Sequence, residues 1–327
     1  VIALDQDSFV YDGNAKEPTV TLTEAGGTVI PADEYTVSYS NNINVSTSAT
    51  VTATAKADGN YSFTSVTVQF TINQEQAKVV TAPEAAGDPL TFNTRAQKLV
   101  TAGSGSGGTM VYSKDNVTFT DQIPTETKAA DYTVYYKVKG DSNHSDSDVG
   151  SVTVTIAPKT VKDPTIELLD GQGNPLTSYT YDGTAKTPTV KVLDGSTEIT
   201  GTEYSLVYED NIDAGKGMVS ITDKPGGNYT VTGSAAFVIV KANIVFNPAP
   251  SAAAIVYDGK PHELLVPGTA SGGEVLYALN SPTSTYNAAI PQATLAGNYT
   301  VYYKVTGDKN HNDLAVQSVP VTIQRKP

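Results

Sequence analysis

The sequence predicts an all-β protein built from small β-sandwiches. Apolar residues alternate with polar ones at a period of two, as in Val152, Val154 and Ile156, which is typical of strands with one buried face. Turn signals such as Asp12-Gly13 and Gly272-Gly273 recur at short intervals between these strands. Threonine, valine and tyrosine are abundant and suit pleated, half-buried surfaces. No stretch has helical spacing, so we expect no helix longer than one turn.

The chain repeats itself, which indicates tandem modules rather than one large domain. The segment 299–313 repeats the segment 132–146 and differs from it at only three of fifteen positions. The motif Tyr11-Asp12-Gly13 recurs as Tyr181-Asp182-Gly183, and Gly59-Asn60-Tyr61 recurs as Gly227-Asn228-Tyr229. The chain therefore consists of two copies of a unit of about 168 residues.

Each copy divides once more. A third Tyr-Asp-Gly motif begins at Tyr257, well inside the second copy. Its counterpart in the first copy, Phe92-Asn93-Thr94, departs from the motif. We predict four domains in the order A-B-A′-B′, at residues 1–73, 74–157, 158–241 and 242–327. Their linkers are only a few residues long, so we expect closely stacked modules with little hinge freedom.

The strand 132–138 shows the expected arrangement of a B-type module. Tyr132, Val134, Tyr136 and Val138 share one face, and the residues between them share the other. The start of this strand, and of its repeat at Tyr299, resembles strand F of immunoglobulin-like domains. That resemblance implies a tyrosine corner, in which the hydroxyl of Tyr132 or Tyr299 bonds back to the backbone, in the B-type modules and not in the A-type modules.

Three motifs together carry a resemblance to a family. They are the Tyr-Asp-Gly opening, a Tyr-x-Val-x-Tyr strand before Asn41-Asn42 with its counterpart Tyr-x-Leu-x-Tyr before Asp210-Asn211, and Gly-Asn-Tyr before the last strand. The combination resembles the bacterial Ig-like modules called MBG domains, and the B-type modules are similar to a companion module of the same arrays. The resemblance implies four tandem immunoglobulin-like β-sandwich domains in a surface or adhesion protein of gut or oral bacteria, outside the cell.

Composition excludes several classes of function. The 34 acidic residues outnumber the 21 basic ones, for a net charge of −13, which leaves little cationic surface for nucleic acid. The longest apolar run, 235–240, is far shorter than the roughly 20 residues of a membrane helix. The absence of cysteine excludes disulfides and thiolate-bound metals. Val1 lies within a strand-like pattern, so we expect a piece of a longer protein.

No catalytic residues and no cofactor are predicted. His144, His262 and His311 are expected to be exposed turn residues, because no module brings enough of them together for a zinc site. Gly103–Gly108 is expected to be a hairpin loop, since no Gly-Lys-Ser/Thr and no helix follows it. Calcium is an alternative for two oxygen-rich loops, whose candidate donors are Asp141, Asn143, Asp146 and Asp148, and Asp308, Asn310, Asn312 and Asp313. The same residue types also favour simple turns.

The predicted function is that of an elongated, non-catalytic stalk or adhesion region of a bacterial surface protein. The chain is expected to be a monomer. One alternative is a set of modules that binds a host or cell-surface glycan or a matrix protein. Tyr135 and Tyr302, which should face outward beside Lys137 and Lys304, are the candidate ligand-binding residues for that alternative. Another alternative is an accessory region of a large secreted enzyme.

Overall fold

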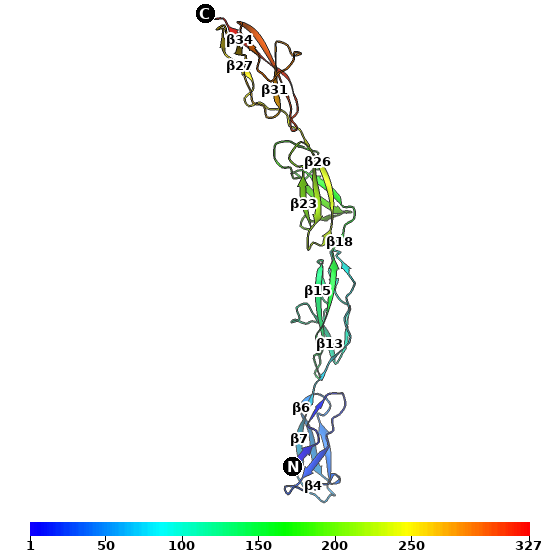
Figure 1. The fold of residues 1–327 in the computed structure, drawn as a ribbon. Helices are drawn as coiled ribbons and strands as arrows, with labels where there is room; N and C mark the ends of the chain where they lie inside the picture. The colour runs from blue at the N-terminus through cyan, green and yellow to red at the C-terminus, as the bar shows by residue number, and fades with distance from the viewer. The chain divides into compact units, whose positions relative to one another are not determined.

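The computed structural model describes residues 1–327 as strands and loops (Figure 1). Its one helical segment is a single 3₁₀ turn, η1 (Ala32–Glu34), so the all-β prediction is confirmed. No helix is present with the length and apolar character needed to span a membrane.

The chain forms two compact units, Val1–Lys159 and Thr160–Pro327. Each unit contains two four-stranded sheets, here named A and B in the first unit and A′ and B′ in the second. The strands of the first unit's sheets, in spatial order, are for A β2 (Ser8–Val10), β7 (Val66–Asn73), β6 (Ser46–Ala55) and β5 (Tyr35–Ser40), and for B β10 (Leu90–Thr91), β17 (Gly150–Ala157), β15 (Ala130–Gly140) and β13 (Gly108–Ser113). Those of the second unit are for A′ β20 (Tyr179–Thr180), β26 (Gly233–Val240), β24 (Gly215–Asp223) and β23 (Tyr204–Glu209), and for B′ β28 (Ile255–Val256), β34 (Leu314–Gln324), β33 (Gly297–Thr306) and β31 (Glu274–Leu279).

All four sheets have the same topology. The first strand of each runs parallel to the last strand, while the other neighbours pair antiparallel. In sheet A, for example, Phe9 on β2 lies opposite Ile72 on β7. This shared order is the structural counterpart of the sequence repeat and gives tandem immunoglobulin-like sandwiches.

Shorter strands complete the second layers and the connections. In the A-type regions they are β1 (Ile2–Leu4), β3 (Val20–Thr23), β4 (Val29–Ile30), β19 (Thr165–Leu169), β21 (Thr189–Asp194), β22 (Thr197–Ile199) and β25 (Tyr229–Thr230). In the B-type regions and linkers they are β8 (Glu75–Gln76), β9 (Lys78–Thr81), β11 (Gln97–Lys98), β12 (Ser104–Ser106), β14 (Thr125–Glu126), β16 (His144–Ser145), β18 (Lys159–Thr160), β27 (Ser251–Ala252), β29 (His262–Glu263), β30 (Leu265–Val266) and β32 (Gln292–Ala293).

The cores lie between these layers. Leu22 of β3 packs with Val51, Phe70 and Ile72 of sheet A, and none of the four is more than 2 % exposed. Burial of such apolar surface supplies most of the stability of a sandwich of this size. The inward residues are those that the period-two alternation predicts, because successive side chains of a strand point to opposite faces.

Both predicted tyrosine corners are confirmed. The Tyr132 hydroxyl donates to the carbonyl oxygen of Lys128 at 2.9 Å, and that of Tyr299 to Leu295 at 2.8 Å. In sheet A the Tyr35 hydroxyl bonds instead to the distant carbonyl of Val20.

The expectation of a hairpin loop at Gly103–Gly108 is partly wrong, because Ser104–Ser106 forms β12 and pairs with β9. A Cβ on Gly105 would clash with Val138 Cγ2, so this glycine permits close packing onto sheet B. Within Gly103–Gly108, only Gly107, at φ 76°, has the left-handed backbone of a turn.

Candidate functional site: a polar joint in each unit

In each unit, one end of the A-type sheet meets a loop of the B-type sheet, and we call this contact the joint. The joint of the first unit consists of Tyr11, Asn44–Val45 and Glu75–Ala77 on one side and Asn143–Ser145 on the other. The joint of the second unit consists of Tyr181, Asp213–Ala214 and Ala242 against Lys309–Asn312. Both joints use the repeated Asn-His dipeptide of the B-type loop.

Backbone hydrogen bonds tie the linker to this loop. In the first joint, β8 runs parallel to β16, with Glu75 N–H donating to Asn143 O at 3.2 Å and Ala77 N–H to Ser145 O at 2.9 Å. In the second joint, Ala242 N–H donates to Asn310 O at 2.9 Å and Asn312 N–H to Ala242 O at 2.8 Å. The linker therefore pairs with the next sheet's loop, as the short strand β8 in the first joint and through a single parallel bridge at Ala242 in the second.

An asparagine side chain bridges each joint. Asn143 Oδ1 accepts from Val45 N–H at 3.0 Å, and Asn143 Nδ2 donates to Asn44 Oδ1 at 3.1 Å. In the second joint, Asn310 makes the same two bonds, to Ala214 N–H and Asp213 Oδ1, both at 2.8 Å. Asn310 is only 6 % exposed, so its amide is held by defined partners rather than by water.

A histidine follows each bridging asparagine and packs on a tyrosine from the Tyr-Asp-Gly motif. The rings of Tyr11 and His144 meet edge to face at 5.2 Å between centroids, and those of Tyr181 and His311 at 5.4 Å. The sequence-based expectation of exposed turn histidines is therefore wrong for His311, which is 9 % exposed, for the half-buried His144, and for the half-buried His262, which lies in strand β29.

An aspartate fixes each of these imidazoles. His144 Nδ1 lies 2.7 Å from Asp141 Oδ1, and His311 Nδ1 lies 2.8 Å from Asp308 Oδ1. These hydrogen bonds are the main reason that the pKa of each aspartate is lowered, with a backbone N–H two residues on as the second cause. His262, outside the joints, is also bonded to an aspartate, but through its other ring nitrogen, with Nε2 2.8 Å from Asp258 Oδ1.

The two joints differ in charge. In the second, Lys309 Nζ lies 2.7 Å from Asp213 Oδ2, and this contact lowers the pKa of Asp213 and raises that of Lys309. At the same positions the first joint has the neutral residues Asn44 and Ser142. Because both charged side chains are exposed, the ion pair adds little to the stability of the second joint. Its main effect is on how the two sides of the joint are oriented.

The turn that presents Asn44 or Asp213 is itself braced. Asn42 and Lys16 exchange two hydrogen bonds, Lys16 N–H to Asn42 O at 2.7 Å and Asn42 Nδ2 to Lys16 O at 3.0 Å. Asn211 and Lys186 do the same at 2.7 and 2.9 Å. In both copies the braced residue is thus the asparagine of the pair, Asn41-Asn42 or Asp210-Asn211, that follows the Tyr-x-Val-x-Tyr strand of the first copy and the Tyr-x-Leu-x-Tyr strand of the second.

In the two oxygen-rich loops that are the candidate calcium sites, the polar side chains bond to separate protein groups. Asp146 bonds Lys137 Nζ and Gly140 N–H, and Asp148 accepts from Gln76 Nε2. In the second unit, Asp313 accepts from Gly307 N–H, and Asn312 donates to Lys241 O and Asn243 Oδ1. No group of three or more His, Asp or Glu residues has the arrangement of a metal site.

Tyr135 and Tyr302 occupy equivalent positions on β15 and β33, and both are partly buried. Their cross-strand neighbours are small: Ser113 and Ser151 beside Tyr135, and Ala278 and Ser318 beside Tyr302.

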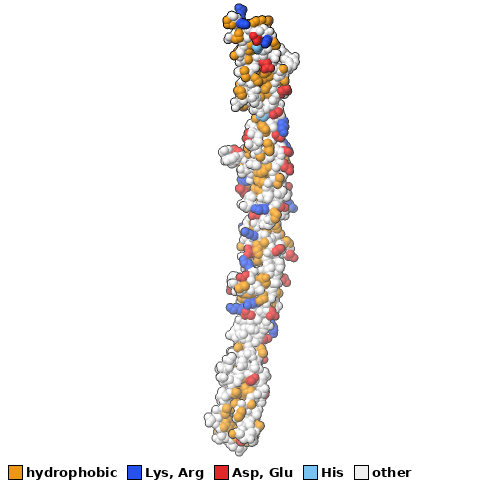
Figure 2. Space-filling view, turned by 60° about the vertical axis from the view of Figure 1, so that its left-hand side comes forward, with side chains coloured by type: hydrophobic (Ala, Val, Ile, Leu, Met, Phe, Trp, Pro, Cys, Tyr) orange, Lys and Arg blue, Asp and Glu red, His pale blue; other side chains and the backbone are white.

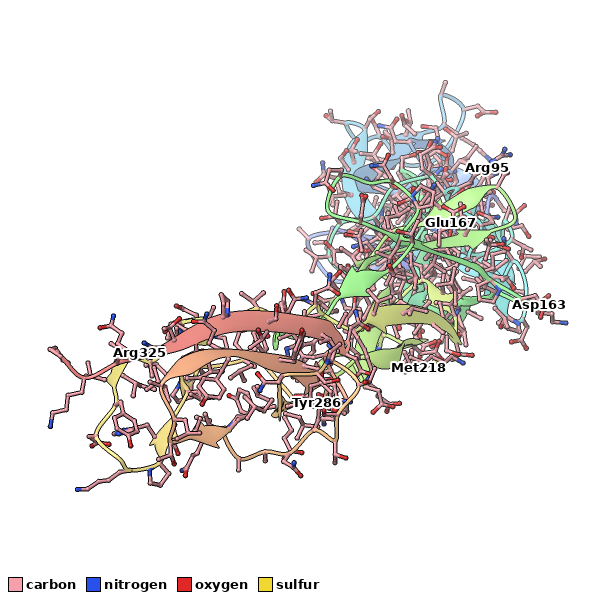
Figure 3. The ribbon with its side chains drawn as sticks, turned by 90° about the horizontal axis from the view of Figure 1, so that it is seen from above. Arg95, Asp163, Glu167, Met218, Tyr286 and Arg325 are labelled. Carbon is pink, nitrogen blue, oxygen red and sulfur yellow. The ribbon has the colours of Figure 1, made fainter.

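The neighbouring lysines are engaged with other rings. Lys137 Nζ lies 4.8 Å from the Phe119 ring, and Lys304 Nζ lies 4.7 Å from the ring of Tyr286, which Figure 3 labels. A loop aromatic thus covers part of each outer sheet face next to the two tyrosines.

The surface gives no sign of a polyanion site on the face in Figure 2, where acidic and basic side chains are interspersed. The part nearest the N-terminus, at the bottom of that view, shows few charged side chains.

No protein-family model and no curated protein matches the sequence. Among solved structures, the chain is similar to Sidekick-1 immunoglobulin domains 1–5, with 10 % identity, a TM-score of 0.34, and coverage of 99 % of this chain and 81 % of that one. It is also similar to protocadherin gammaB7 EC3–6 (13 % identity, TM-score 0.24, coverage 98 % and 100 %). A third similar structure is Bacteroides ovatus SGBP-B in complex with a mixed-linkage heptasaccharide (12 % identity, TM-score 0.20, coverage 76 % and 71 %). At these TM-scores, the fold assignment rests on the strand order of the chain itself.

Proposed function

We propose that the chain is a jointed, non-catalytic stalk or adhesion region of a bacterial surface protein outside the cell, made of four Ig-like domains at residues 1–73, 74–157, 158–241 and 242–327. The observation that carries this proposal is the joint, which forms twice from the same residue types. A polar bridge that is duplicated together with the domains it connects serves the connection and not a ligand.

The joint supports a spacer function through its physics. Parallel backbone pairing, a bridging asparagine and a ring contact constrain both the distance and the rotation between the A-type and B-type domains. A flexible linker would leave both free. Each A-B pair would then act as one stiff element, and duplication of the pair would lengthen the stalk.

Small-angle X-ray scattering of the intact chain tests the proposal. Four sandwiches of roughly 35–40 Å each, placed end to end, give a rod on the order of 150 Å and a radius of gyration of roughly 43 Å. A compact chain of this length would give about 20 Å. A measured radius of gyration close to the compact value would overturn the stalk function.

Binding of a glycan or a matrix protein is the second candidate function. The observation that favours it is the pair of small residues, exposed Ser151 and Ser318, beside the rings of Tyr135 and Tyr302, because they leave one ring edge accessible. Binding to a glycan and matrix array should be saturable and should be lost in the double variant Tyr135→Ala and Tyr302→Ala, with little change in Tm. Equal binding by this variant would exclude the two tyrosines as the site.

A further inference from the structure

Sheet A′ ends in an edge strand whose outer side is open. This strand, β23, is labelled in Figure 1 and has only β24 as a neighbour in the sheet. In an antiparallel pair, every second residue of a strand directs its backbone N–H and C=O groups away from the partner strand. No other backbone hydrogen bond involves residues 204–209. The outer side of β23 is therefore available to pair with a further strand.

The B-type sheets cover the corresponding edge with their own loops. On β13, Tyr112 N–H donates to Thr120 O at 2.7 Å, and Thr120 N–H donates back to Tyr112 O at 2.9 Å. On β31, Tyr277 and Asn287 exchange the same two hydrogen bonds, at 2.7 and 2.9 Å. Covering an edge in this way prevents it from pairing with another chain. Sheet A′ has no such cover on β23.

The side chains of β23 suit contact with an added strand. Leu206 and Val207 are 36 % and 47 % exposed, so apolar surface lies beside the open backbone groups. Tyr204 and Tyr208 hold the strand in place, because their hydroxyls donate to carbonyl oxygens of the second layer. The edge strand of sheet A, β5, has the polar Ser38 in place of Val207.

Acidic residues mark both ends of β23. Glu203 precedes the strand, and the exposed Glu209 and Asp210 end it and follow it. Between them, residues 204–208 carry no charge. In sheet A the end of β5 is neutral, with Ser40 and Asn41 at the equivalent positions. The charge pattern of β23 complements a strand that is basic at both ends and uncharged in the middle.

We propose that the open edge of β23 binds an extended segment of a partner protein in which uncharged, β-branched residues lie between two basic residues. Main-chain hydrogen bonds to β23 supply the affinity, and contact with Leu206 and Val207 selects apolar side chains. The basic residues lie next to Glu203 at one end and Glu209 at the other. This site uses no joint residue, so it does not depend on the stalk function.

The labelled peptide Lys-Val-Thr-Val-Thr-Val-Lys tests the site by fluorescence anisotropy against the intact chain. We expect saturable binding, together with slower amide hydrogen exchange on the outer side of β23. The peptide with both lysines replaced by glutamate should bind roughly tenfold more weakly, because like charges then meet at both ends. The peptide with proline at its central valine should also bind more weakly, since proline has no N–H to donate.

Two chain variants distinguish the edge of the sheet from its outer face. Val207→Lys places a charge on the edge strand and should weaken binding roughly tenfold or more. Val238→Lys is the matched control, because Val238 is also an exposed valine of sheet A′ but lies on β26, away from the edge. Binding by Val238→Lys should be unchanged, and thermal unfolding shows whether both variants are folded.

A second pair of variants tests the charges. Glu209→Gln combined with Asp210→Asn should weaken binding of the lysine peptide roughly threefold to tenfold. Glu263→Gln combined with Glu274→Gln removes two exposed carboxylates from the B′ region and should leave binding unchanged.

Three results would overturn the proposal. The first is absence of saturable binding to the unmodified chain, and the second is equal binding of the lysine and glutamate peptides. The third is self-association of the chain in analytical ultracentrifugation that Val207→Lys abolishes, since the occupant of the edge would then be a second copy of the chain.

Discussion

Substitution of Asn310 by alanine is the sharpest perturbation of the second joint. It removes the acceptor of Ala214 N–H, a hydrogen bond of 2.8 Å, while the backbone bonds of the linker remain. A partly buried N–H left without its partner costs about 1–2 kcal/mol. Since about 1.4 kcal/mol is a factor of ten, the joint should open roughly 5- to 30-fold more often.

Amide hydrogen exchange followed by NMR measures this opening. The amides of Ala214 and Ala242 should exchange faster by that factor in Asn310→Ala, because both are protected only while the joint is closed. The control is Asn174→Ala, which changes an asparagine in an exposed turn of the same unit. Unchanged protection at Ala214 and Ala242 in a folded Asn310→Ala protein would refute the view that the asparagine holds the joint.

Three further predictions concern the second unit. Since Lys309 lowers the pKa of Asp213, the carboxylate stabilises the joint above its ordinary titration range, and this contribution is lost as the pH falls through the lowered pKa. The protection of the joint amides, taken relative to the intrinsic exchange rate at each pH, should therefore decrease below about pH 4, and less so in Lys309→Met. Gly272→Ala should open the joint, because a Cβ at this position would clash with the His311 ring. Gly297→Ala is the control, since a Cβ there has no neighbouring atom within 4 Å, and identical amide exchange at the joint in the two variants would contradict the prediction. Tyr299→Phe removes the corner hydrogen bond and should lower the free energy of unfolding by about 1 kcal/mol in a denaturant titration, with unchanged stability as the contrary result.

The sequence predicts the parts of this structure that depend on local pattern. The tyrosine corners were predictable because the hydroxyl of Tyr132 reaches a carbonyl only four residues back. The strand faces were predictable because period-two alternation places Val134 and Val138 together in the core.

The joints were not predictable in the same way, because Asn143 and Asn44 are 99 residues apart. The signal was present as a repeat: both A-type modules carry Tyr-Asp-Gly, which recurs in the second B-type module, and Asn-His marks the loops of both B-type modules. A turn-forming sequence such as Gly-Asp-x-Asn-His looks exposed when it is considered alone, and it becomes buried only when a neighbouring module covers it. The burial of His311 is therefore a property of the pair of modules.

The parallel pairing of the first and last strands, shared by all four sheets, determines how the chain responds to tension. A pull on the two chain ends draws β2 and β7 in opposite directions along their length, so Tyr11 N–H to Asn73 O and Thr71 N–H to Asp7 O are loaded in shear and rupture together. The corresponding bonds Phe92 N–H to Ala157 O, Tyr181 N–H to Val240 O and Tyr257 N–H to Gln324 O repeat this clamp. An antiparallel pair pulled from one end would instead unzip one bond at a time. Force applied to this polypeptide thus has to break the parallel pairing before the first and last strands of any of the four sheets can separate.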